Sequence, residues 1–190
     1  MFWSRFLLVV LATVSVIAQS LPEKRGMVKA SAKLGSREAP PPPPSPYDEI
    51  MAKIADYQNK TSKAMTEPKP ERPAKLIAIT TDLLGAIKDY NSGFQVEFKQ
   101  LNPSDAAQRG QPMIDFSKKL YILLRSCKGT RDEKLYKNIK EISDLVDSIG
   151  GLMAEKIQPP INHMILPAYA KYSDKLNELE KATRAHNDAQ

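Results

Sequence analysis

Apolar side chains recur every three or four residues along most of the chain, a spacing that places them on one face of an α-helix. Five such stripes are separated by proline or glycine, and they cover Tyr47–Tyr57, Leu76–Leu101, Met113–Cys127, Leu135–Met153 and Ile161–Leu179. No segment alternates apolar and polar residues for long enough to indicate a strand. The pattern predicts an all-α protein, in which about five helices form an elongated antiparallel bundle over residues 47–190.

The residues at the ends of the stripes predict where the helices begin and stop. Ser45-Pro46-Tyr47-Asp48 predicts an N-cap followed by proline at the first helical position, and Thr130-Arg131-Asp132-Glu133 matches a capping box before the fourth helix. Gly129 is the predicted stop of the third helix, and Pro159-Pro160 is the predicted end of the fourth. Residues 102–112 contain Asn-Pro and Gly-Gln-Pro sequences, which predict a loop or a short helical turn.

Irregular helix geometry is predicted at three positions inside the stripes. Asn91-Ser92-Gly93 indicates a bend or break in the second helix, because glycine weakens a helix. The pair Gly150-Gly151 is typical of a kink or of a close approach between two helices. Pro167 predicts a kink near the start of the fifth helix, and the polar tail from Lys181 is expected to fray.

The N-terminus has the three parts of a secretory signal peptide. Arg5 supplies the positive region, residues 6–17 are apolar or small, and Ala18-Gln19-Ser20 supplies the small residues of a cleavage site. The apolar stretch is shorter than the about 20 residues that a membrane-spanning helix needs. Residues 1–20 are therefore predicted to be a signal peptide and the protein to be extracellular. Cleavage after the dibasic pair Lys24-Arg25 would remove residues 21–25 as a propeptide.

Residues 26–46 are poor in large apolar side chains and end in a run of prolines, Pro40–Pro44 followed by Ser45-Pro46. Proline donates no backbone hydrogen bond, so this segment is predicted to be a disordered basic arm that ends in a polyproline II helix. Such a helix can dock on an aromatic-lined groove. Because readers of that type are mostly cytosolic, the favoured interpretation is a stiff spacer.

The formal net charge of the chain is +6, but its basic residues are interspersed with glutamate and aspartate along the helices. Nucleic-acid binding needs basic side chains concentrated on one face, so no nucleic-acid partner is predicted. A bundle that lies on a membrane surface needs a lysine-rich face beside a strongly apolar face. The same mixing of charges makes membrane-surface binding a less favoured alternative.

Residues that would support catalysis are scarce in the sequence. Histidine occurs only at His163 and His186, outside any ligand pattern, and no Cys-x-x-Cys pair is present. No metal site, cofactor or catalytic residue is predicted, and the chain is predicted not to be an enzyme. A hydrolase that uses scattered carboxylates is the enzymatic alternative.

The single cysteine, Cys127, lies in an apolar stripe and is predicted to be a buried core residue. The less favoured alternatives are a disulfide to a second chain and a nucleophilic Cys127–His163 dyad.

Two further kinds of site are indicated. Asn59-Lys60-Thr61 is an N-glycosylation sequon, which predicts a glycoprotein if Asn59 is modified during secretion. Flexible methionines and aromatic rings suit an apolar ligand cavity between helices. The residues that would line it are Phe94, Phe98, Met113, Phe116 and Met153; the alternative is that they simply fill the core.

Together these features predict a secreted, non-enzymatic helical bundle that binds an extracellular or host protein partner. The alternative is a carrier that holds fatty acids or other small apolar ligands in the interior of the bundle.

Overall fold

The computed structural model describes residues 43–184, and within them the chain forms five α-helices and one short 3₁₀ helix. The helices are α1 (Pro46–Thr66), α2 (Arg72–Gln100), α3 (Pro103–Leu124), η1 (Arg125–Cys127), α4 (Glu133–Lys156) and α5 (Asn162–Thr183). The predicted all-α bundle is confirmed. The predicted signal peptide and propeptide lie outside the described residues, as do residues 26–42 of the predicted arm.

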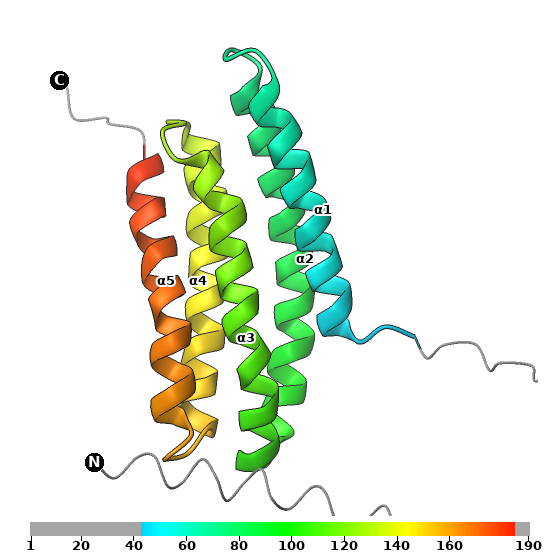
Figure 1. The fold of residues 1–190 in the computed structure, drawn as a ribbon, viewed down its shortest axis with the longest axis vertical. Helices are drawn as coiled ribbons and strands as arrows, with labels where there is room; N and C mark the ends of the chain where they lie inside the picture. Colours follow the sequence, from blue (N-terminus) through cyan, green and yellow to red (C-terminus); the bar gives the residue numbers. More distant parts are fainter. Residues whose placement is uncertain (1–42, 185–190) are drawn as a thin grey trace, which may run out of the picture. The chain divides into compact units, whose positions relative to one another are not determined.

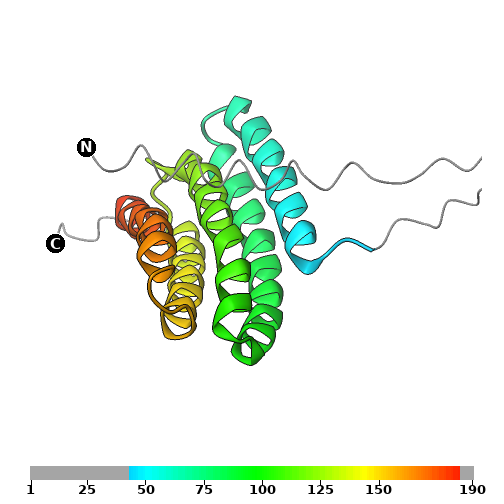
Figure 2. The same cartoon turned by 60° about the horizontal axis from the view of Figure 1, so that its bottom comes forward.

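The five helices pack in two layers with their axes roughly aligned (Figures 1 and 2), α1, α3 and α5 in one and α2 and α4 in the other. Consecutive helices run in opposite directions (Figure 1). The most extensive contacts join α2 to α4, α3 to α5, α4 to α5 and α1 to α2. Although they are consecutive, α2 and α3 make few close backbone approaches, which leaves room between them.

The interior of the bundle is a continuous apolar core to which every helix contributes. Ile54, Leu83, Phe116, Ile139 and Leu176, one from each helix, are fully shielded from solvent. Burying a side chain of this kind stabilises the fold by about 1.5–3 kcal/mol. Among the residues that the structure describes, no helix is long and apolar enough to cross a membrane.

Buried polar contacts fix the register between neighbouring helices. The Asn138 side chain on α4 donates hydrogen bonds to the hydroxyls of Thr80 (3.0 Å) and Thr81 (2.9 Å) on α2. On the other side of α4, Ser143 donates to Asn177 of α5 at 2.7 Å. Because such bonds are directional and buried donors are costly to leave unpaired, sliding either pair of helices would be penalised.

The predicted cap of α1 is confirmed, whereas the predicted cap of α4 is wrong. Ser45 and Asp48 form a capping box at the start of α1. In α4 the N-cap is Asp132, not Thr130, and its carboxylate accepts hydrogen bonds from the amides of Lys134 (2.8 Å) and Leu135 (3.0 Å). One carboxylate thus satisfies two amides that the helix itself leaves unpaired.

The predicted loop over residues 102–112 is also wrong, because this segment forms the first half of α3. Asn102 is the N-cap, and its side-chain oxygen accepts a hydrogen bond from the Asp105 amide at 3.0 Å. The small residues Ala106, Ala107 and Gly110 are buried there. Small buried residues leave no stripe of large apolar side chains, so periodicity alone does not reveal this half of the helix.

The predictions for glycines and for the end of the fifth helix have mixed outcomes. Gly129 ends the third helical segment with a positive φ of 88°, as predicted, since glycine adopts this conformation without penalty. Gly150 marks a close helix approach, as predicted: a Cβ there would lie 2.9 Å from Tyr169 Cε1. Helix α2 continues without a break through residues 91–93, and α5 continues past Lys181, where fraying was predicted, to Thr183.

Candidate functional site

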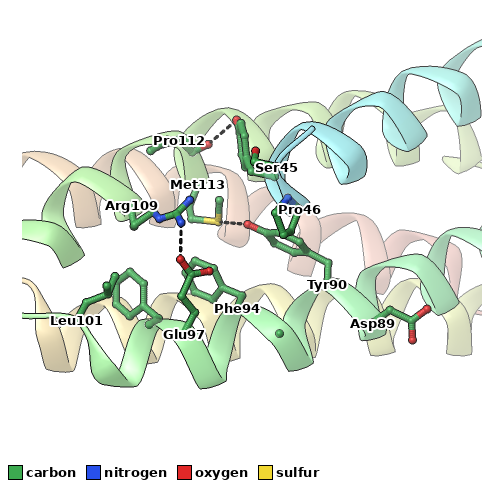
Figure 3. Close-up of a pocket in the computed structure, with 13 residues that line it drawn as sticks. Ser45, Pro46, Asp89, Tyr90, Phe94, Glu97, Leu101, Arg109, Pro112 and Met113 are labelled. Carbon is green, nitrogen blue, oxygen red and sulfur yellow. Dashed lines mark hydrogen bonds and ion pairs between the residues drawn. The ribbon is translucent and has the colours of Figure 1, made fainter. Parts of the chain in front are cut away.

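A cleft with a volume of about 310 Å³ opens between the first turn of α1, the C-terminal half of α2 and the N-terminal half of α3. We call it the aromatic cleft. Figure 3 shows side chains from α2 and α3 facing each other across it, with Pro46 of α1 beside them. Its aromatic and large apolar lining residues are Tyr47, Tyr90, Phe94, Phe98, Leu101 and Met113.

Two features of the sequence create this space. Gly93 of α2 lines the cleft, and a Cβ added to it would meet no atom within 4 Å. At the rim, α1 begins at Pro46, and the residue before it, Ser45, has an extended backbone. The helix therefore does not cover the cleft beyond Pro46. The cleft therefore lies where α1 starts and where α2 has a glycine in place of a larger residue.

The wall formed by α2 is a ladder of aromatic rings spaced four residues apart, which places them on one helix face. The ring centroids of Tyr90 and Phe94 are 5.9 Å apart, and those of Phe94 and Phe98 are 4.8 Å apart in a stacked arrangement. The Tyr90 ring also contacts Phe116 of the core, at 5.4 Å. These separations are typical of favourable aromatic pairs, so the ladder is a stable wall.

Tyr90 also reaches across the cleft, where its hydroxyl donates to the sulfur of Met113 at 3.5 Å (Figure 3). Burial raises the pKa of Tyr90 well above its ordinary value. The pKa of Tyr47 is raised as well, by burial and then by the nearby Asp115 and Asp48 carboxylates. Both tyrosines are therefore neutral hydrogen-bonding groups at physiological pH.

Charged groups sit at the mouth of the cleft. The Arg109 guanidinium of α3 donates to the Glu97 carboxylate of α2 (Figure 3), and both side chains are about half exposed. Asp89 is a further lining residue. An ion pair as exposed as this one contributes only about 0–1 kcal/mol. A ligand that carries its own charge could therefore replace either partner at little cost.

The predicted cavity residues are only partly brought together. Phe94, Phe98 and Met113 line the cleft, whereas Phe116 and Met153 are fully buried in the core and do not. Spacing could not separate the two groups, because all five lie on buried faces.

Several residues that line the cleft are not indicated by the spacing of apolar residues in the sequence, namely Tyr47, Tyr90, Glu97 and Arg109. The two tyrosines belong to apolar stripes and were assigned only to helix faces, while Arg109 lies in the segment that was predicted to be a loop. The signal that could have found the cleft is Gly93, a missing side chain within an aromatic stripe.

The other residues singled out by the sequence lie away from the cleft. Asn59 is exposed on α1, while Thr61 of its sequon is buried and its hydroxyl has no hydrogen-bond partner. The predicted processing residues Ser20, Lys24 and Arg25 lie outside the described residues.

Cys127 is fully buried, and burial raises the pKa of its thiol to about 12. His163 stands at the start of α5, at the opposite end of the bundle from Cys127 after α3 (Figure 1). The alternative of a Cys127–His163 dyad is therefore contradicted. Within residues 43–184, no three His, Cys, Asp or Glu side chains are grouped so that they could hold a metal ion.

No family model matches the chain, and no curated protein or solved structure matches it either.

Proposed function

We propose that this protein is a secreted, non-enzymatic binding module and that the aromatic cleft is where it engages a protein partner. The observation that carries the proposal is the cleft itself, a hollow between helices whose wall is a row of aromatic rings. Residues that dominate the energy of protein interfaces are enriched in tyrosine, tryptophan and arginine. Tyr47, Tyr90 and Arg109 all line this cleft.

The distribution of polarity also supports a binding site for a protein segment. An interface typically has an apolar centre surrounded by a polar rim. Here Phe94 and Phe98 form the apolar wall, and Asp89, Glu97 and Arg109 provide charged groups around the mouth. A partner could bury an apolar side chain against the rings and satisfy the rim with polar groups.

Photo-cross-linking tests the proposal. A photoreactive residue would replace Asp89, which is exposed and lines the cleft, and in a control variant it would replace Lys134, which is exposed at the start of α4. Each variant is expressed, and the culture fluid that contains it is illuminated. We expect a covalent protein adduct from position 89 and none from position 134. Equal labelling at both positions, or labelling at neither, would argue against the cleft as the binding site.

Secretion is a separate part of the proposal and has its own measurement. Export with signal-peptide cleavage predicts that the protein recovered from culture fluid begins at Leu21, or at Gly26 if the Lys24-Arg25 site is also cut. N-terminal sequencing distinguishes these products. Protein that stays inside the cell and retains Met1 would overturn this part.

A second candidate function is the transport of a small apolar molecule in the same cleft. The volume of about 310 Å³ lies at the lower end of the range for small-molecule pockets, which is roughly 300–1,000 Å³. Native mass spectrometry of the purified protein tests it. A carrier would show a bound apolar mass that the cleft-filling variant Gly93→Leu loses and the control Gly85→Leu keeps. A spectrum of the empty chain alone would remove this candidate.

A further inference from the structure

We propose that the aromatic cleft of one molecule holds the proline-rich segment of a second copy of the chain, residues 37–44. This inference rests on the proposed function, because it requires the cleft to be a binding site. It deepens that function by naming the partner as a second copy of the same chain.

The first argument is the place where the segment joins the bundle. Ser45 and Pro46 line the cleft, so the proline run joins the bundle at the rim of the cleft. Ser45 has an extended backbone, with φ −69° and ψ 156°, and the Asp48 amide donates to its hydroxyl at 3.2 Å. The capping box therefore fixes the direction of the chain, and the described residues before α1 lead away from the other helices (Figure 1).

The stiffness of prolines makes this direction decisive. A polyproline II helix advances about 3.1 Å per residue and does not fold back on itself. A proline run that keeps the direction of Ser45 would extend away from the cleft of its own molecule and would be free to reach the cleft of another. Pro43 and Pro44 are exposed, so their rings are available to such a neighbour.

The chemistry of the cleft suits this occupant. Grooves that bind polyproline II helices are lined by aromatic rings, against which proline rings pack. Tyr90, Phe94 and Phe98 supply such a row of rings at intervals of one helical turn, and Tyr47 lies at the rim beside them. Because a polyproline II segment is already ordered before it binds, it loses little conformational entropy on docking.

Charge complementarity points to this arm in particular. The carboxylates Asp89 and Glu97 line the cleft, and Arg109 is the only basic residue among the described residues that line it. The arm carries three basic residues before its proline run, Lys29, Lys33 and Arg37, against the single acid Glu38. Arg37 precedes Pro40 by three residues, about 9 Å in an extended chain, so it can reach the rim carboxylates while the prolines contact the rings.

Symmetry closes the assembly at two copies. Each molecule has one arm and one cleft, so mutual exchange forms a two-fold dimer in which both clefts are filled. After the first arm has docked, the second contact is intramolecular and gains from a high effective concentration. A weak contact made twice can therefore hold the dimer.

Sedimentation equilibrium tests the proposal. The sample is the full chain, purified from the culture fluid in the form in which the cell releases it. We expect a dimer that dissociates when the synthetic peptide of residues 31–44 is added, and that weakens at high salt because the rim contact is ionic. Gly93→Leu, which fills the cleft, and deletion of residues 37–44 should each give a monomer. Gly85→Leu is the matched control: it lies on α2, has no atom within 4 Å of an added Cβ and does not line the cleft.

Several results would overturn the proposal. A monomer at every concentration rules out exchange between copies, and so does a dimer that survives both Gly93→Leu and the deletion. Photo-cross-linking from position 89 separates this inference from the proposed function. An adduct with a different protein, together with a monomeric chain, refutes arm exchange and leaves the binding module intact. An adduct of twice the chain mass supports both, and no adduct removes both.

Discussion

Gly93 of α2 and Gly150 of α4 lie at nearly the same level of the bundle. Each is two residues from a hydrogen bond that joins these two helices, in which Gln95 of α2 donates to Ser148 of α4. In the α4–α5 seam, Gly150 makes room for Tyr169, and an added Cβ would lie 2.9 Å from that ring. In the space between α2 and α3, an added Cβ at Gly93 would meet nothing within 4 Å. A glycine in a helical stripe can therefore mark a tight contact or a cavity, and its neighbours decide which.

The contacts across the two seams differ in the same way. The hydroxyl of Tyr169 donates to the Val146 carbonyl at 2.6 Å inside the α4–α5 seam, where both groups are buried. Between α2 and α3, the charged contact of Arg109 and Glu97 is half exposed. Buried directional bonds hold elements together more firmly than exposed ion pairs. We therefore expect the cleft to open locally at a lower free-energy cost than the α4–α5 seam.

Replacing a phenylalanine should have the largest effect and should separate the core from the cleft. Phe116→Ala removes a fully buried ring and should lower the free energy of unfolding by about 3–5 kcal/mol. Phe94→Ala should cost less, because Phe94 is 8% exposed and lines the cleft, whereas Phe116 is fully shielded from solvent. Urea unfolding of both variants measures the difference. Equal losses would show that the cleft is closed in solution.

Adding a methyl group at each glycine should give changes of opposite sign. Gly150→Ala forces a Cβ against the pinned ring of Tyr169, and overpacking of this kind costs about 1–3 kcal/mol. Gly93→Ala adds helix propensity without a clash and should stabilise α2 by up to about 1 kcal/mol. Thermal unfolding should show the first variant below the parent protein and the second above it. Destabilisation by Gly93→Ala would mean that the space is not free.

Much of the fold could be predicted from the sequence, because large apolar residues at helical spacing dominate the core. The stripes located all five helices, and Ser45 and Gly129 marked real ends. The first half of α3 escaped because Ala106, Ala107 and Gly110 pack there without large side chains. The cap of α4 was misplaced because Thr130 and Asp132 are both good N-caps, and only the backbone geometry decides between them.

The cleft itself was less accessible to prediction from the sequence. Phe94, Phe98 and Met113 were identified as lining residues, but Phe116 shares their stripe-like spacing and lies in the core. A cavity depends on how far apart two helices lie, and the spacing of residues along one helix carries no such information. The part that Pro46 plays at the rim depends on where α1 begins relative to α2 and α3, which is a tertiary property.

Alkaline pH should lower the free energy of unfolding through the buried thiol of Cys127. Burial raises the pKa of its thiol from 9.0 to about 12, so the folded state retains a proton that the unfolded state releases. Stability should be unaffected below pH 9 and should then fall by about 1.4 kcal/mol for each pH unit up to 12. The control Cys127→Ala should remove this slope between pH 9 and 10. An unchanged slope in that variant would mean that the thiol is not shielded from water.

The smallest expected effect compares one hydroxyl in each seam. Tyr169→Phe removes the buried bond to the Val146 carbonyl and should cost about 1 kcal/mol, as for a typical buried hydrogen bond. Tyr47→Phe removes a 3.1 Å bond to the Pro112 carbonyl at the rim of the cleft. It should cost less, because water can replace a partner there. Chemical unfolding of both variants measures this difference. A larger loss from Tyr47→Phe would mean that the rim, where α1 crosses to α3, is as firmly closed as the α4–α5 seam, and an arm from a second copy could then enter only by breaking that bond.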